Sequence, residues 1–524
     1  MTETNFIYSE DERTYRAWGY DESLAIKKYD SIQKIKDEKK KNEIISEFEG
    51  QELNLGRARQ KRLYDSKVLV VGSSCLSQII SSCVAGIGIG NIYLMDNKRF
   101  SERDRNDFLC LKNYKQIGKE KVGLIANELK KINTHARITP RFSKFNKAFA
   151  SELNPQIIID ATNDCYSKET CLDYAVKNKI PMISASADDY RGTYGIYWPM
   201  SGNKNLDYIL NLEFNNLTQI GFTSGVIGGL VADEIRKYNF QQARSDKNLR
   251  SNERFIYNLY STKNRQGLQE DLEKYFLISW SEKRVLVAGA GALGNSVALS
   301  LVLLGIGKID ILDFDTIEST NVPRQILLRG EIGGKKAEIV SKRIKEINPR
   351  IKSNFIYGKV GEYSVLNERF RNKYSEDFFI PNEEQLKKGI GLVTEDRLLK
   401  EKYDLIFGCF DNKYARMWLN DFTVKNNIPY IDTGVGTHQG QVAIFVPDKT
   451  KSINDQLVLE NFPDLVRNSC MNQGQAATII PNMVIGNLAV GESTHILNSG
   501  GYVSDPILGY DSFSSGKIYF KGKH

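Results

Sequence analysis

Three charged side chains in the second half of this chain could act together on a polyphosphate. Arg324 and Lys336 can neutralise β- and γ-phosphate oxygens, which leave together as pyrophosphate if an α-phosphate is attacked. Asp411 is a hard oxygen ligand that suits Mg²⁺ held jointly with a nucleotide. It follows an apolar run typical of a parallel strand, whose carboxyl end faces the ligand crevice. The alternative is two surface cations and a turn-forming aspartate.

A glycine-rich turn must position these side chains. It consists of Gly289, Gly291 and Gly294 and follows an apolar run expected to be a strand over 285–288. Gly289 permits the tight turn, Gly291 lets a phosphate approach the backbone, and Gly294 lets a helix pack closely on the strand. The expected helix over 295–304 directs its N-terminal amides at an anion.

The segment after this helix completes the pattern of a nucleotide site. A second strand is expected over 309–312, and it ends at Asp313, about twenty residues past the turn, where a carboxylate can reach a ribose hydroxyl. Strand, turn, helix, strand and acid therefore predict nucleotide binding. A glycine-rich turn in an ordinary α/β domain is the alternative.

The chain contains an internal repeat. Residues 68–100 align without a gap on residues 285–317, and GIGIGNIYLMD matches LLGIGKIDILD. Later segments match too, in the same order. We therefore expect two tandem α/β domains, 1–268 and 269–524, each a Rossmann-like, mostly parallel sheet flanked by helices.

The two copies differ where chemistry would occur. Ser74 and Ser77 replace the second and third glycines, Asp107 replaces Arg324, and Asn163 replaces Asp411. Lys121 matches Lys336 but cannot make a site alone. The first copy is interpreted as degenerate and the second as the working site; two working sites of different specificity are the alternative.

Composition narrows the function class. The net charge of +8 comes from lysines scattered among acids, so nucleic-acid binding is not favoured. The seven cysteines include no C-x-x-C pair, which predicts reduced thiols, a cytoplasmic location and no zinc site. No apolar span of membrane length and no signal peptide are recognised, so no membrane partner is expected.

The second copy resembles the ubiquitin-activating enzyme superfamily, which includes adenylyltransferases acting on sulfur-carrier proteins. The resemblance rests on GAGALG, DFDTIESTNVPRQ, GGKK, CFDN and the late SCMNQG, which occur in the family's order. The first copy, with RTYRAWG at residues 13–19, resembles the inactive half of two-part activating enzymes. The resemblance implies a pseudo-dimer of an inactive and an active adenylation domain.

The resemblance also implies roles for particular residues. Binding of ATP would involve Gly289, Gly291, Gly294, Asp313, Asp315, Asn321 and Gln325. Arg324, Lys336 and Asp411 would act on the phosphates and Mg²⁺, and Arg13 of the first copy would reach across to them. For Arg13, a structural salt bridge is the alternative.

Cys470 stands where sulfur-carrier adenylyltransferases carry a cysteine that can take the activated acyl group. A thiolate there could convert an acyl-adenylate to a thioester; a buried, inert thiol is the alternative. The second copy also carries an insertion near 363–400, either an element over the site or a neutral surface loop. No large catalytic-cysteine domain or C-terminal ubiquitin-like domain is recognised, which leaves recruitment of a conjugating enzyme open.

The expected function is ATP- and Mg²⁺-dependent adenylation of the C-terminal carboxylate of a ubiquitin-like protein. Adenylation of a peptide carboxylate in natural-product or sulfur-carrier biosynthesis is the enzymatic alternative. A binding module without chemistry and a nicotinamide-dependent oxidoreductase are the others. The oxidoreductase is disfavoured because it would not need Arg324, Lys336 and Asp411 together.

Overall fold

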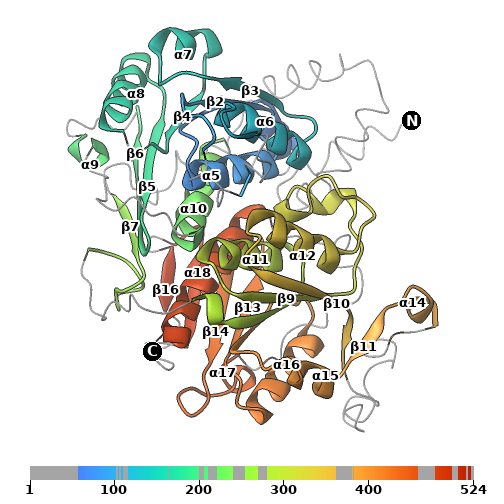
Figure 1. Ribbon diagram of the computed structural model, residues 1–524. Helices are drawn as coiled ribbons and strands as arrows, with labels where there is room; N and C mark the ends of the chain where they lie inside the picture. The colour runs from blue at the N-terminus through green and yellow to red at the C-terminus, as the bar shows by residue number, and fades with distance from the viewer. Residues whose placement is uncertain are drawn as a thin grey trace, which may run out of the picture.

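The computed structural model describes most of the chain. The described residues are 57–101, 104, 108–109, 116–162, 164–199, 206–210, 221–239, 254–268, 280–361, 381, 383–457, 459, 478–498, 506–514 and 517–520. They form two sheets in two halves of the molecule, one from each copy of the repeat (Figure 1).

The first sheet has the strand order β3-β2-β1-β4-β5-β6-β7. Its strands are β1 (Lys67–Val71), β2 (Asn91–Met95), β3 (Arg137–Arg141), β4 (Ile157–Asp160), β5 (Met182–Ala187), β6 (Arg191–Tyr197) and β7 (Phe255–Asn258). Its helices are α4 (Arg57–Asp65), α5 (Cys75–Gly86), α6 (Lys121–Ile132), α7 (Lys147–Leu153), α8 (Cys165–Asn178), α9 (Asp207–Leu210) and α10 (Gly221–Asn239). Strands β1 to β5 pair in parallel, and β6 and β7 continue the sheet antiparallel.

The second sheet repeats this order as β10-β9-β8-β12-β13-β14-β15, with β11 and β16 added at its two edges. Its strands are β8 (Arg284–Ala288), β9 (Lys308–Asp313), β10 (Lys352–Val360), β11 (Gly391–Val393), β12 (Leu405–Gly408), β13 (Tyr430–Val435), β14 (Gln439–Phe445), β15 (Ile507–Asp511) and β16 (Ile518–Phe520). Its helices are α11 (Ala292–Leu304), α12 (Lys336–Ile347), α14 (Glu383–Lys387), α15 (Glu395–Leu399), α16 (Lys413–Lys425), α17 (Ile453–Leu457) and α18 (Ile479–Asn498), with 3₁₀ turns η4 (Trp280–Glu282), η5 (Ser319–Asn321) and η6 (Ile326–Leu328).

These two sheets confirm the predicted fold class of tandem Rossmann-like domains. The observed elements differ from the expected bounds at their ends. Helix α11 begins at Ala292 rather than at 295, because Gly291 already stands at the N-cap position. The boundary expected between residues 268 and 269 stays a prediction.

A shared core joins the two copies. One cluster of buried apolar side chains includes residues of α5, α6 and α10 from the first copy and of α11, α12 and α18 from the second. Smaller clusters lie against α7 and α8, and against α15 and α16, on the outer faces of the two sheets. Helices α10 and α18 lie between the two halves (Figure 1). Because the inner helices of both copies bury the same core, the two halves pack as a pseudo-dimer.

Small residues allow α10 and α18 to approach closely. A Cβ added at Gly225 would lie 2.0 Å from the Asn487 side chain, and one at Gly229 would lie 2.7 Å from Val484. The glycines are therefore needed for this contact, since any larger side chain at these positions would separate the helices.

Reciprocal ion pairs flank this contact. Arg265, beyond β7, donates to both Glu492 carboxylate oxygens on α18, at 2.7 and 2.8 Å. In the opposite direction, Lys517, before β16, pairs with Glu234 on α10 and donates to Tyr194 Oη at 2.7 Å. Both cations are buried and both have positive φ, 56° in each case. Each copy thus places a hairpin cation on the other copy's central helix, as expected of a pseudo-twofold interface.

Candidate nucleotide site

The glycine turn joins β8 to α11 at the carboxyl edge of the second sheet. Gly289 has φ +105°, and a Cβ there would lie 2.6 Å from the Cys409 carbonyl at the end of β12. A Cβ at Gly294 would lie 1.8 Å from the Gly289 carbonyl. Gly72 of the first copy has the same close approach, 2.8 Å from Ala161 O, at φ +113°. Gly289 and Gly294 are therefore required by packing, and the first of these requirements is common to both copies.

Gly291 differs from the other two glycines. A Cβ added there meets no atom within 4 Å, and Gly291 caps α11 without a side-chain hydrogen bond. In the first copy, the matching Ser74 caps α5: its Oγ accepts from the Ser77 N–H and donates to Ala161 O. The serine hydroxyl thus takes up one N-terminal amide of α5 from within the chain. The helix N-terminus is satisfied internally in the first copy and open in the second.

Asp313 ends β9 beside the glycine turn, where the sequence predicts it. Its Oδ2 accepts from the Ala290 N–H at 2.6 Å, and its Oδ1 accepts from the Asp315 N–H at 2.7 Å. Burial and the nearby Asp315 carboxylate raise the pKa of Asp313 to about 6, against the opposing effect of Lys336. In the first copy, the Ser73 hydroxyl donates to the matching Asp96 at 2.6 Å. A serine hydroxyl in the first copy therefore takes the place that the Ala290 N–H has on the matching carboxylate of the second.

Lys336 opens α12 and lies next to the same loop. Its buried Nζ pairs with Asp315 Oδ2 at 2.8 Å, and its N–H donates to Asp315 O. The turn before it pairs with the loop after β9 through a bridge between Thr316 and Lys335. Lys336, Asp313 and Asp315 therefore lie together, with the lysine already facing a carboxylate.

Arg324 lies in the buried connection between η5 and η6. Its N–H and that of Gln325 donate to Asn321 O, at 3.1 and 2.9 Å. The buried Asn321 side chain closes the first turn by accepting from the Glu318 N–H. Gln325 is also buried, and its Oε1 has no hydrogen-bond partner. An unsatisfied buried acceptor carries a free-energy cost, so Gln325 Oε1 marks a point where a ligand donor would be favourable.

Sequence reasoning missed the side chain that joins this connection to the glycine turn. Asn295 Nδ2 donates to the Ala290 and Gly291 carbonyls, at 2.8 and 2.9 Å, and its Oδ1 accepts from the Leu327 N–H at 3.0 Å. Gln78 makes the matching bonds in the first copy, to Ser73 O and from the Leu109 N–H. Amide side chains at matching places on the two helices that follow the turns were the available signal.

Asp411 lies past the end of β12 and is exposed. The next residue, Asn412, caps α16 by accepting from the Ala415 N–H at 2.8 Å, which fixes where the loop ends. Since the Cys409 carbonyl touches Gly289, the loop that carries Asp411 lies at the edge where the glycine turn lies. An exposed carboxylate at this edge fits a Mg²⁺ ion that also binds phosphate oxygens.

A buried ion pair under this loop was also missed. Arg416 Nε donates to Asp432 Oδ1 at 3.0 Å, and Tyr430 Oη donates to the same oxygen at 2.8 Å. The attraction of Asp432 raises the pKa of Arg416, although burial alone would lower it. The alignment of CFDN with the first copy places Lys168 opposite Arg416, which could have pointed to this pair.

Two predicted residues, Arg13 and Cys470, lie outside the described residues. Cys409 is buried, and burial raises the pKa of its thiol to about 12, which agrees with a packing role. Of the insertion near 363–400, the described part contributes β11, which pairs with β10, and helices α14 and α15. Within the described residues, no cluster of three or more His, Cys, Asp or Glu side chains could hold a metal ion.

The fold defines a pair of Rossmann-like α/β domains, of which the second has the open glycine turn. The chain belongs to the ThiF family: the model of that family matches residues 48–274 and again residues 263–518. The two matches confirm the resemblance to ubiquitin-activating and sulfur-carrier adenylyltransferase proteins.

Several curated relatives are similar over part of the chain. SUMO-activating enzyme subunit uba-2 of Caenorhabditis elegans is 29% identical over 181 residues, 33% of this chain and 26% of that protein. A probable molybdopterin-synthase adenylyltransferase of Porphyra purpurea is 28% identical over 45% of this chain and 51% of its own. Ubiquitin-like modifier-activating enzyme 5 of Arabidopsis thaliana is 25% identical over 47% of this chain and 54% of that protein. The matches thus span about a quarter to about half of the relatives' length.

Solved structures also match part of the chain. A crystal structure of PaaA matches 38% of this chain and 63% of the PaaA chain, at 23% identity and a TM-score of 0.33. A structure of E. coli MccB with ATP matches 38% of this chain and 62% of the MccB chain, at 21% identity and a TM-score of 0.32. Separately, none of the helices in the described ranges is long and apolar enough to cross a membrane.

Proposed function

We propose that the second copy adenylates the C-terminal carboxylate of a ubiquitin-like protein, using ATP and Mg²⁺, and that the first copy binds no nucleotide. The observation that carries this proposal is the open N-terminus of α11 at Gly291, set against the Ser74 cap of α5. Membership of the ThiF family supports it, as do relatives named as SUMO-activating and molybdopterin-synthase adenylyltransferase proteins.

The residues at the site suit binding of the nucleotide. The open amides of α11 donate to phosphate oxygens, and the absence of a side chain at Gly291 leaves room for them. Asp313 accepts from a ribose hydroxyl, for which its carboxylate is already oriented by the Ala290 and Asp315 amides. Gln325 offers its unsatisfied Oε1 to a donor of the substrate.

The reaction is a displacement at the α-phosphorus. A carboxylate oxygen of the substrate protein forms a bond to Pα, and the bond from Pα to the bridging oxygen of pyrophosphate breaks. Arg324 and Lys336 neutralise the charge that develops on the leaving pyrophosphate, so no nucleophile from this chain is needed. Mg²⁺, held by Asp411 together with the phosphates, would add to that neutralisation. Lys336 leaves Asp315 for the phosphates, since a trianionic group attracts it more strongly than one half-exposed carboxylate.

The roles of two further residues, Arg13 and Cys470, are proposed from the sequence alone. Arg13 would reach from the first copy to the phosphates. Cys470 would attack the acyl-adenylate, forming a thioester as AMP leaves.

ATP–pyrophosphate exchange tests the first step. Purified chain should incorporate labelled pyrophosphate into ATP when a ubiquitin-like protein with a free C-terminus from the same genome is added. Peptides with free C-termini form a second arm, which separates protein from peptide substrates. A folded chain that gives no exchange with any candidate contradicts the proposal.

A second experiment addresses Cys470. A thiol-sensitive adduct with the substrate protein should form on a gel and should be lost in Cys470→Ala, while pyrophosphate exchange continues. An adduct that persists in Cys470→Ala would assign the thioester elsewhere or exclude it.

A further inference from the structure

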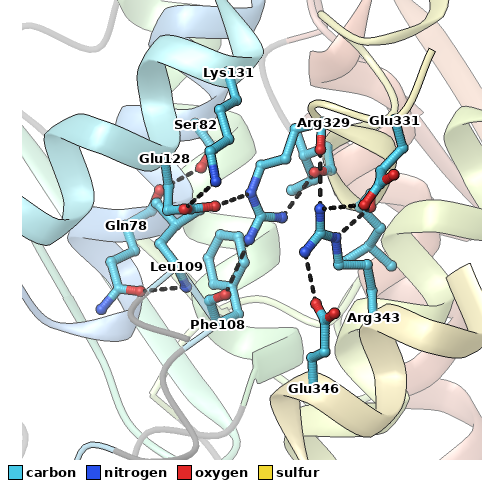
Figure 2. Close-up of polar contacts among 12 residues, drawn as sticks. Gln78, Ser82, Phe108, Leu109, Glu128, Lys131, Arg329, Glu331, Arg343 and Glu346 are labelled. Carbon is cyan, nitrogen blue, oxygen red and sulfur yellow. Dashed lines mark hydrogen bonds and ion pairs between the residues drawn. The ribbon is translucent and has the colours of Figure 1, made fainter. Parts of the chain in front are cut away.

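A fully buried arginine connects the working copy to the degenerate one. Arg329 directly follows η6, and its Nη1 donates to Ile326 O in the same copy at 2.9 Å. Its Nε donates to Glu128 Oε2 on α6 of the first copy at 2.8 Å, and its Nη2 approaches Phe108 O at 3.5 Å. Figure 2 shows this guanidinium between residues of the two copies.

The contacts of Arg329 follow the pseudo-symmetry of the chain. Leu109 and Leu327 occupy matching positions, since their amides donate to Gln78 and Asn295. The carbonyls before them, of Phe108 and Ile326, are therefore matching groups, and Arg329 donates to both. One arginine thus bridges the equivalent turns of the two copies.

A second arginine holds the same turn from within its own copy. Arg343 on α12 donates to Leu327 O at 3.3 Å and to Arg329 O at 3.0 Å. Its charge is balanced by Glu346 at 2.6 Å and Glu331 at 3.5 Å (Figure 2). Helices α6 and α12 are counterparts, and Glu128 stands on α6 where Arg343 stands on α12. The turn at 326–329 is therefore fixed from both helices.

Glu128 is the carboxylate that the structure pairs with the Arg329 guanidinium. Burial lowers the pKa of Arg329, and attraction to Glu128 opposes that effect. The pKa of Glu128 itself lies below its ordinary value because attraction to Arg329 and hydrogen bonds from Lys131 and Arg329 outweigh burial. Lys131 pairs with the other carboxylate oxygen at 2.7 Å on the more exposed side. The two oxygens therefore have separate partners, one toward the site and one toward solvent.

We infer that Glu128 of the first copy is a positioning residue for Arg324 and Gln325 of the second copy. It acts by holding Arg329, and with it the turn at η6 that directly follows those side chains. In this role, the degenerate copy contributes part of the support of the working site. The consequence for catalysis rests on the proposed function, whereas the ordering of the turn can be tested without it.

Hydrogen–deuterium exchange gives a readout that does not depend on activity. In Glu128→Gln, the amides of residues 324–328 should exchange faster by about tenfold or more, because Arg329 loses its ionic partner. Lys131→Gln is the matched control, since it removes the other partner of the same carboxylate and should leave these amides unchanged. Equal exchange of these amides in both variants overturns the inference.

Steady-state pyrophosphate exchange separates positioning from general stability. Glu128→Gln should lower kcat by about tenfold or more with a KM for ATP within about threefold, since the glycine turn and Asp313 remain intact. A purely structural role would lower the thermal midpoint and leave kcat per folded molecule unchanged, and that outcome also overturns the inference. Glu128→Asp keeps the charge but shortens the reach, so it should fold and show the same changes if Glu128→Gln does not fold.

The outcomes distinguish this inference from the proposed function. Absence of exchange activity in the unaltered chain would count against adenylation, and amide exchange would still decide the role of Glu128. Pyrophosphate exchange by the unaltered chain and by Lys131→Gln, together with loss of that activity in Glu128→Gln, supports both the adenylation proposal and the positioning role of Glu128.

Discussion

Replacing Gly291 by serine should transfer the character of the first copy to the second. Gly291 has φ −70°, which any residue adopts, and a Cβ there meets no atom within 4 Å. The new hydroxyl would cap α11 as Ser74 caps α5. The substitution therefore places a side chain in the proposed phosphate position without straining the fold.

The two expected effects have opposite signs. A serine cap is better than glycine by a few tenths of a kcal/mol, and the stiffer unfolded chain adds about 0.4–1 kcal/mol, so the free energy of unfolding should rise by about 0.5–1.5 kcal/mol. One lost hydrogen bond to a charged phosphate is worth about 1.5–3 kcal/mol. That corresponds to ATP binding weaker by about 10- to 150-fold.

Calorimetric titration with a non-hydrolysable ATP analogue, paired with urea unfolding, measures both effects on one preparation. Ser74→Gly is the matched control: it removes the cap of α5 and should leave nucleotide affinity unchanged. In contrast, Gly294→Ala should destabilise the fold by about 1–3 kcal/mol, because its Cβ would lie 1.8 Å from the Gly289 carbonyl. Unaltered nucleotide affinity in a folded Gly291→Ser variant would refute the assignment of the open helix terminus as the phosphate site.

Three further predictions concern charge. Lys336→Met should reduce pyrophosphate exchange by about 100-fold or more while the chain stays folded, since it removes charge neutralisation at the leaving group; an unchanged rate would exclude that role. ATP affinity should fall as pH drops through about 6, where the Asp313 carboxylate protonates, and Asp313→Asn should flatten this dependence in titrations from pH 5 to 8. Because folding raises the pKa of Asp313, the contribution of this group to folding stability declines as pH rises from the ordinary pKa of an aspartate toward 6. ATP affinity rises over the same pH range, so affinity and stability change in opposite directions. Glu492→Gln should lower the free energy of unfolding by about 3–5 kcal/mol, because it leaves the buried Arg265 charge unpaired, and Glu152→Gln at an exposed pair should cost about 1 kcal/mol or less in the same urea titration.

The sequence by itself determined the fold and the types of residue at the site. Apolar runs, glycine spacing and the internal repeat follow local rules of strand, turn and helix formation, so the order of elements could be predicted from them. Comparison of the copies also identified Ser74 as a departure from the glycine pattern. Sequence could not show that the serine hydroxyl caps α5, because that depends on where α5 begins relative to the strand end.

Only the tertiary structure decided which charges pair between the two copies. Two ion pairs join residues that are far apart in the chain: Arg329 with Glu128, and Arg265 with Glu492. In the sequence, each of these charged residues looks like part of an ordinary solvated surface. Packing of the inner helices into one core buries these charges and brings them together. Burial makes each pairing strong, since an unpaired charge would be costly there, and that burial arises from the pseudo-twofold contact rather than from any local pattern.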